Sequence, residues 1–127
     1  MGITQVNVTS PANEIIFQDT AMGTSVDGIK ASSALVYSVT VDNSANGGAA
    51  SYVKLYNLAS GSVTLGTTVP DEVILAPAGQ VVTAIFKTGA AGGKTFGTAL
   101  SAACVTTGGT AGIVAPSSSV VVSVNYV

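Results

Sequence analysis

Residues 33–43 read SALVYSVTVDN, the stretch that most clearly decides the fold class. Apolar side chains occupy every second position, at Leu35, Tyr37, Val39 and Val41. Polar side chains alternate with the last three of these, at Ser38, Thr40 and Asp42. Because successive side chains of a strand point to opposite faces, this period of two predicts a half-buried antiparallel strand.

Similar short runs lie on both sides of this segment, separated by Gly, Pro and Asn. We expect strands at residues 14–18, 52–58, 81–86 and 118–127, with residues 33–43 and 52–58 joined as a hairpin. Residues 73–75 are a short apolar run, and residues 63–69 suit an edge strand before Pro70. Residues 96–105 fit a strand or a short helical turn equally well. Residues 19–30 are expected to form a loop with a tight turn at Asp27-Gly28.

This pattern predicts an all-β fold, an antiparallel β-sandwich that is either immunoglobulin-like or jelly-roll-like. Val, Thr, Ser, Ala and Gly dominate the chain, and β-branched residues favour strands. We expect one domain over residues 13–127, with residues 1–12 forming an N-terminal arm or the first strand. The predicted core consists of Leu35, Tyr37, Val39, Val41, Val53, Leu55, Phe86, Val122 and Val124.

The scarcity of charge excludes several classes of function. Of 127 residues only 8% are charged, the net charge is -2, and the chain has four Lys but no Arg and no His. Four scattered Lys residues cannot drive nucleic-acid binding by counterion release. Without His, triads and His-ligated zinc are absent. We expect no catalytic residues, no cofactor, no metal, no secretory leader and no membrane partner.

Three local motifs have a structural explanation that we favour. Residues 88–95 (TGAAGGKT) end like a phosphate-binding loop, but Thr88 stands where that motif needs Gly. Residues 7–9 (NVT) match a glycosylation acceptor, which such a short pattern does often by chance. Cys104 lies between Ala103 and Val105, as expected of a thiol in the core.

The acidic residues are equally undiagnostic. Only Asp71 and Glu72 are adjacent, and neighbours on a strand point to opposite faces. Asp42, Asn43 and Asn46 are the best local set for calcium, and it is a weak one. We interpret these groups as solvated loop residues.

The uncharged surface is the informative feature. Charged residues are depleted at the centres of interfaces, because covering a charge costs solvation. With so few charges, much of this surface must be Ser, Thr, Asn, Gly and Ala. We therefore expect a protein that works packed against other subunits, the alternative being a monomer with a neutral surface.

From about residue 34 onward the chain resembles small all-β virion proteins of tailed bacteriophages. The resemblance is carried by the order and spacing of residues 39–43 (VTVDN), 52–57 (YVKLYN), 66–70 (GTTVP), 76–79 (APAG) and 96–100 (FGTAL). It implies a capsid decoration (cement) protein that binds the outer surface of the major capsid protein shell and stabilises it. It also implies a homo-oligomer, most often a trimer, located on the capsid surface of the virion after synthesis in the host cytoplasm.

Other readings stay open at this point. The chain could be a neck, tail or fibre component of the virion, or a carbohydrate-binding module for a host surface; an enzyme is not expected. An arm could dock on the capsid by adding a strand to a sheet edge of a capsid subunit. The residues concerned are Ile3, Thr4, Val6 and Val8, with the last three on one face and Ile3 opposite. The rival interpretation makes this segment the first strand of the sandwich.

Overall fold

Two antiparallel sheets pack face to face in the computed structural model, which describes residues 14–86 and 92–127. The five-stranded sheet contains β1 (Ile15–Asp19), β9 (Val121–Tyr126), β3 (Ala34–Asp42), β6 (Val81–Ile85) and β7 (Lys94–Phe96). The four-stranded sheet contains β2 (Asp27–Lys30), β8 (Leu100–Val105), β4 (Ser51–Tyr56) and β5 (Glu72–Ala76). In the described ranges the only helical element is a 3-10 turn, η1 (Ser60–Ser62). The predicted all-β sandwich is confirmed.

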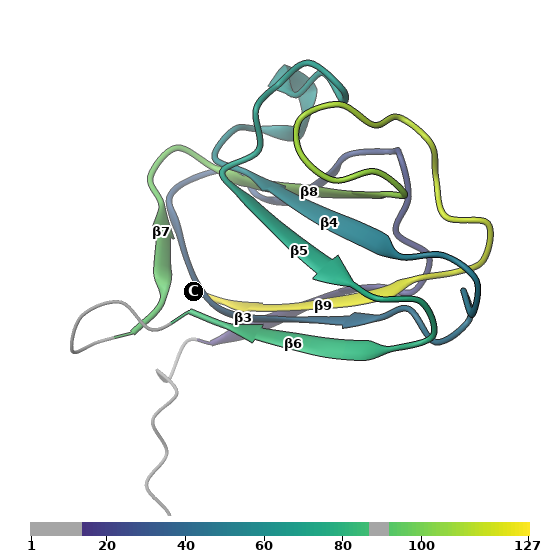
Figure 1. Cartoon of the computed structure of the whole chain (residues 1–127). Helices are drawn as coiled ribbons and strands as arrows, with labels where there is room; N and C mark the ends of the chain where they lie inside the picture. The colour runs from purple at the N-terminus through teal and green to yellow at the C-terminus, as the bar shows by residue number, and fades with distance from the viewer. Residues whose placement is uncertain (1–13, 87–91) are drawn as a thin grey trace, which may run out of the picture.

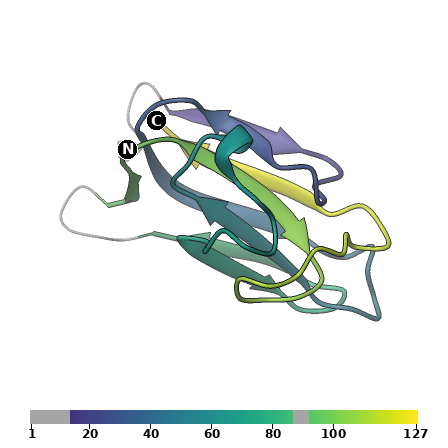
Figure 2. The ribbon, with the colours of Figure 1, turned by 90° about the horizontal axis from the view of Figure 1, so that it is seen from above.

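The strand pairing is nested. Moving outward from the connection between β4 and β5, β4 pairs with β5, β3 with β6, β2 with β8 and β1 with β9. The further pairs β3–β9 and β4–β8 connect these nested pairs into the two sheets. This is a long hairpin rolled on itself, the jelly roll, and it decides between the two sandwich types that the sequence left open. Figure 1 shows the two layers, and Figure 2 shows that the strand axes of the two layers are roughly aligned.

The core lies between the sheets and is built largely of the predicted residues. Six of these side chains are completely buried: Val39, Val41, Val53, Leu55, Val122 and Val124. Phe86, which follows β6, is only partly buried against this cluster. Val122, Val124 and Tyr126 of β9 all face inward, together with Val120 just before the strand, as the alternation predicted.

The prediction that Leu35 and Tyr37 are core residues is wrong. The register of β3 against β9 shifts between Val36 and Ser38, which marks a β-bulge. The extra residue of a bulge changes which positions face inward on its two sides. Ala34 and Val36 are therefore buried together with Val39, whereas Leu35 and Tyr37 are half-buried.

The predicted hairpin between residues 33–43 and 52–58 is also wrong, although both strands exist as β3 and β4. They belong to different sheets, and residues 43–50 cross from one to the other. Asn43, buried at the start of the crossing, donates from Nδ2 to the carbonyl oxygens of Ala49, Ala76 and Pro77. The crossing is thereby tied to the chain that connects β5 with β6.

Other elements follow the sequence in part. The expected strand at residues 14–18 is β1, and the ambiguous residues 96–105 divide between the end of β7 and the whole of β8. Residues 63–69 form turns, not an edge strand, and Asp27-Gly28 begins β2, not a tight turn. Residues 81–86, expected as a buried strand, contain the edge strand β6. The proposed arm, residues 1–12, lies outside the described residues.

Candidate contact surface

The outer faces of the two sheets differ sharply. On the five-stranded sheet the outward side chains lie in rows across β1, β9, β3 and β6, set by the strand register. We call this surface the bare face. It comprises Ile16, Gln18, Ser38, Thr40, Asp42, Val81, Thr83, Ile85, Val121, Ser123 and Asn125. Asp42 is the one charged residue in this set.

The middle row of the bare face is a line of small uncharged polar groups. Gln18 faces Ser123, Ser123 faces Thr40, and Thr40 faces Thr83. Gln18 Nε2 donates to Ser123 Oγ at 3.1 Å, and the hydroxyls of Thr40 and Thr83 are 3.0 Å apart. Because these groups bond one another across strands, their desolvation under a partner costs little.

The outer face of the four-stranded sheet is covered by the chain itself. Lys54 and Tyr56 on β4 point outward from the sandwich, yet both are fully buried. Ser101 Oγ on β8 donates to Leu58 O at 2.8 Å, beneath the segment that holds η1. Residues 106–117 cover Lys54 and Tyr52, and a Cβ placed on Gly108 would meet the Tyr52 ring at 2.8 Å, whereas Leu75 on the edge strand β5 stays 49% exposed. Among the residues that the structure describes, the bare face is therefore the broader sheet surface open to an external partner.

The ammonium group of Lys54 is buried beneath this covering loop. Its Nζ donates to Ala111 O at 2.9 Å and to Thr110 O at 3.2 Å. Burial lowers the pKa of its ammonium group, because desolvation disfavours the charged form. Two carbonyl oxygens solvate the cation in place of water, so Lys54 holds the covering loop on β4.

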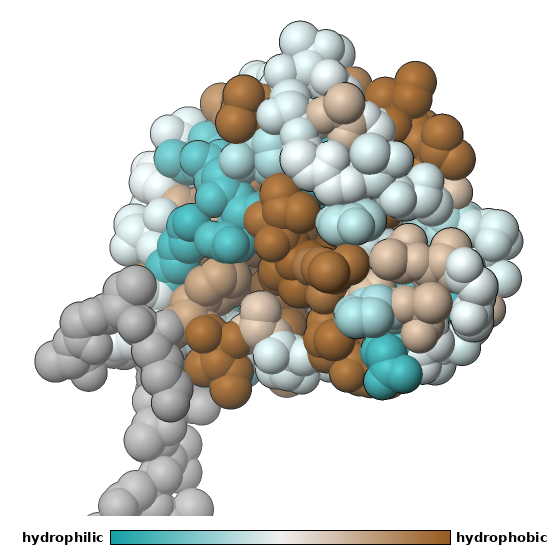
Figure 3. Space-filling model, in the orientation of Figure 1, coloured by the Kyte–Doolittle hydropathy of each residue, from teal (hydrophilic) through white to brown (hydrophobic). Residues whose placement is uncertain are grey.

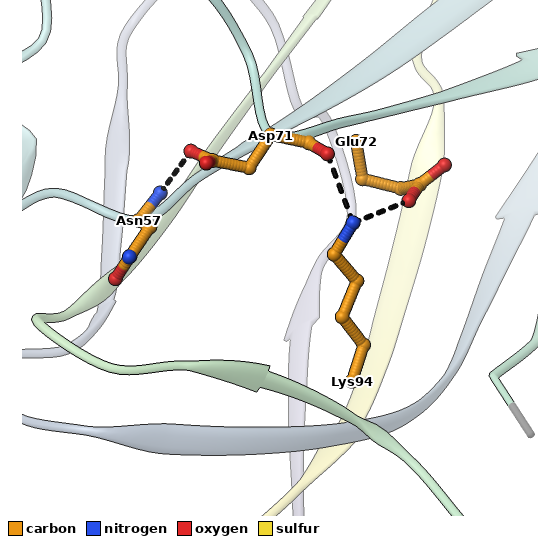
Figure 4. A network of polar contacts seen from close by, with 4 residues as sticks. All are labelled: Asn57, Asp71, Glu72 and Lys94. Atoms are coloured by element: carbon orange, nitrogen blue, oxygen red, sulfur yellow. Dashed lines mark hydrogen bonds and ion pairs between the residues drawn. The ribbon is translucent and has the colours of Figure 1, made fainter. Parts of the chain in front are cut away.

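The end of the phosphate-loop-like motif has a structural role. Lys94 on β7 forms an ion pair with Glu72 Oε2 at 2.8 Å and donates to Asp71 O at 3.0 Å (Figure 4). Asp71 Oδ2 accepts in turn from the Asn57 backbone N–H at 2.7 Å. A strand, not a helix, contains Lys94, so the described end of the motif lacks the helix N-terminus of a phosphate-binding loop; residues 88–91 of the motif lie outside the described residues. Lys94 fastens the start of β5.

The sequence did not reveal one acidic pair. Asp19 ends β1 and Asp27 begins β2, which places two carboxyl groups at the side of the sandwich where these strands are edges. Burial raises the pKa of Asp27 to about 6, with further contributions from a hydrogen bond to Asp19 and from its negative charge. Asp27 Oδ2 is buried, and no described group hydrogen-bonds it. The two residues are eight positions apart in a segment expected to be a loop, so no spacing pointed to them.

The weak calcium candidate is a hydrogen-bond hub. Asn43 Oδ1 accepts from Asn46 Nδ2 at 2.9 Å and from Ser51 Oγ at 2.8 Å, and Asn46 Oδ1 accepts from Ser118 N at 2.9 Å. The amide oxygens a cation would need are thus occupied by donors. Hydrogen bonds from Ser44 lower the pKa of the Asp42 carboxyl. In the described part of the chain no three His, Cys, Asp or Glu side chains come together as metal ligands would.

Cys104 on β8 is a core thiol, as predicted. Its side chain is completely buried, and burial raises the pKa of the thiol to about 12. A thiol with so high a pKa forms almost no thiolate at neutral pH and is unreactive.

One side of the sandwich is open and apolar. Along the edges β5 and β6 the side chains of Leu75, Val81 and Ile85 are 49%, 56% and 63% exposed. Figure 3 shows apolar surface gathered over these two strands. The opposite side is closed by residues 20–26, where Met22 is buried and its N–H donates to Val120 O at 3.0 Å. We call the β5–β6 side the open side.

The site residues predicted from sequence, Ile3, Thr4, Val6 and Val8, lie outside the described residues, as do residues 7–9 of the glycosylation pattern. The alternation in residues 33–43 did place Ser38, Thr40 and Asp42 opposite the core, which is where the bare face has them. The sequence could not predict which strand each residue pairs with, and therefore could not predict the rows of side chains across the bare face.

Comparison with known proteins adds no family to this geometry: no family model, curated protein or solved structure matches the chain. Among the described residues no helix has the length and apolar character needed to cross a bilayer.

Proposed function

We propose that the protein is a structural component of a bacteriophage virion, a decoration (cement) protein that binds the outer surface of the major capsid protein shell and stabilises it. The bare face is the surface that meets the shell. Copies of the chain associate as a homo-oligomer on the particle, and the resemblance implies a trimer. The chain has no catalytic task in this proposal.

The observation that carries the proposal is the contrast between the two outer faces. Loops of the chain cover most of one sheet and bury even Lys54 there, whereas none of the segments described in 14–86 and 92–127 covers the other sheet. The bare face has a single charged residue, and its middle row already pairs its polar groups. Such a surface is typical of one that is covered by a neighbour, since charges are depleted at interface cores.

The fold supports the proposal by analogy alone. Jelly rolls occur in viral capsid proteins, and also in lectins and cupins. A cupin-type metal site is unsupported because the chain has no His. A carbohydrate platform would need well-exposed aromatic rings; none of the residues that define the bare face is aromatic, and Tyr37, the aromatic residue of β3, is half-buried. Attachment to a protein shell is therefore the use that fits this surface best.

The test is the position and copy number of the protein in purified particles. We expect about one copy per major capsid subunit on the outer shell, measured by electron cryomicroscopy and quantitative mass spectrometry. A handful of copies at the neck, tail or fibre would replace the cement role with another virion role, and absence from particles would overturn the proposal. Because few ion pairs are available, the protein should stay attached from low to high ionic strength.

A pair of variants tests the face itself. Thr40→Lys places a charge in the middle row of the bare face, whereas Thr67→Lys places the same charge on an exposed turn. We expect Thr40→Lys to fold but to lose shell binding by at least about tenfold, because a buried unpaired charge is costly. Thr67→Lys should bind normally. Equal binding by both variants would contradict the assignment of the bare face.

A further inference from the structure

Strand β6 has an unpaired edge whose backbone groups can be assigned. Backbone bonds of 2.9 Å join Asn43 N to Gln80 O and Phe86 N to Tyr37 O at the two ends of the β3–β6 ladder. Hydrogen-bonded positions alternate along an antiparallel ladder, so Val82 and Ala84 also bond β3. The N–H and C=O groups of the other residues, Val81, Thr83 and Ile85, consequently face away from β3. Nothing in the described part of the chain pairs with that side of β6.

This edge lacks the features that protect sheet edges from pairing. Natural edge strands are commonly short, bulged, charged or interrupted by Pro. β2 is of that kind, with four residues, a register shift after Gly28, and both Asp27 and Lys30. The start of β5 is crossed by Lys94, which bonds Asp71 O and Glu72. β6 reads VVTAI, with no charge, no Pro and no bulge against β3.

The edge is also complementary to itself. If two copies of β6 meet antiparallel about Thr83, the two Thr83 residues face each other, and Val81 of each copy faces Ile85 of the other. All three facing pairs are of the hydrogen-bonded type, which gives about six backbone hydrogen bonds. The side chains that meet are exposed and uncharged in the single chain, so no like charges oppose the contact. β1, in contrast, carries Asp19 at one end and follows Glu14, so two copies of it would bring acidic groups together.

We propose that the free edge of β6 is a self-association site, at which two copies of this chain join their five-stranded sheets around a two-fold axis passing close to Thr83. The occupant of this edge is a second copy of the chain. The pairing places two bare faces side by side in one continuous surface and covers part of the open side. It goes beyond the proposed function, since it concerns the free protein and holds whether or not a shell is the target. A two-fold contact is compatible with trimers only as a contact between trimers.

The first test is the mass of the full chain in solution, by light scattering or sedimentation at concentrations up to the millimolar range. We expect a species of two chains that dissociates on dilution. The Ile85→Lys variant should be a single chain at the same concentrations, because two copies would place charges along the contact. Ile113→Lys is the matched control. The side chain of Ile113 is 67% exposed, similar to the 63% of Ile85, but it lies in the loop over the other sheet. It should remain paired.

The second test traps the contact. In hydrogen-bonded antiparallel pairs the Cα atoms are about 5.5 Å apart, within disulfide range. The Thr83→Cys variant should therefore form a covalent dimer under mild oxidation, while the buried native Cys104 stays silent. Thr40→Cys, one strand further in, should not, because two such residues would be about 14 Å apart, three strand spacings.

The outcomes are decisive. A chain that stays single at all concentrations, a species of three chains only, or equal cross-linking of the two Cys variants would overturn the proposal. Loss of pairing on deletion of residues 2–10 would also overturn it, because the N-terminal segment would then be the occupant of the edge. None of these results bears on shell binding, which is measured on particles.

Discussion

At the scale of single residues, Asn43 is the clearest case of a polar side chain that specifies the fold. It is fully buried, donates to three carbonyl oxygens on two segments and accepts from Asn46 and Ser51. A leucine of similar size could fill the space but would leave those groups unsatisfied. The residue fixes where the chain leaves one sheet for the other.

We expect Asn43→Ala to lower the free energy of unfolding by roughly 3 kcal/mol, because several buried partners lose their hydrogen bonds together. Asn43→Asp keeps the accepting oxygens but removes the donors, so it should also be strongly destabilised at pH 7. Urea unfolding measures both. A loss below about 1 kcal/mol in either variant would show that water can replace the hub.

Asp27 gives a prediction for pH dependence. Its folded pKa of about 6 lies above the ordinary aspartate pKa of 3.8, so the folded state binds the proton more tightly than the unfolded state. The stabilisation is complete below pH 3.8 and is lost as the pH rises through 6.

Asp27→Asn imitates the protonated form. At pH 7 we expect the variant to be more stable than the natural chain, by on the order of 1 kcal/mol after solvent screening. At pH 4 the two should be nearly equal. Unfolding curves at pH 4, 5.5 and 7 measure the difference, and a gap that is constant across this range would contradict the assignment.

At the scale of elements, the bulge in β3 decides which side chains are in the core. Strict alternation in residues 33–43 predicts that Leu35 is buried and Val36 is not, whereas the structure buries Val36 completely and leaves Leu35 half-buried. We expect Val36→Ala to cost about 2 kcal/mol of stability and Leu35→Ala less than about 1 kcal/mol. Chemical denaturation of the two variants measures both losses. A larger loss for Leu35→Ala than for Val36→Ala would contradict the bulge and favour a regular strand.

The limits of prediction from sequence follow from such elements. Alternation identified the strands and faces of β4 and β9, because each has a regular register over its whole length. It failed where one inserted residue shifted the pattern in β3. It also failed at Lys54 and Tyr56, which lie opposite the core yet are buried, because the covering loops come from residues 57–71 and 106–117. Alternation reports which side of a strand a residue occupies, not what covers that side.

At the scale of the whole molecule, the described strands already make a closed set. Every strand pair among the described residues lies within residues 15–126, so none of these pairs needs the proposed arm. Whether residues 1–12 form a docking arm or the first strand of the sandwich can therefore be decided by deleting them.

Deleting residues 2–10 should leave the melting temperature nearly unchanged, since all described pairs survive, and should abolish decoration of particles. Calorimetry and a particle-binding assay supply the two readings. Normal decoration by the shortened chain, or failure to fold, would end the docking hypothesis for Ile3, Thr4, Val6 and Val8.

The place of β9 has a consequence for the synthesis of the protein. This strand lies between β1 and β3, and it is made after them, with Ile15 opposite Tyr126. A ribosome must therefore release residue 126 from its exit tunnel before the larger sheet can be completed. Until then β1 and β3 lack their common neighbour, and a nascent chain with few charges exposes apolar strands. We expect such a chain to need chaperones during translation, and a stop codon placed just before residue 121 to yield an aggregating product instead of a smaller domain.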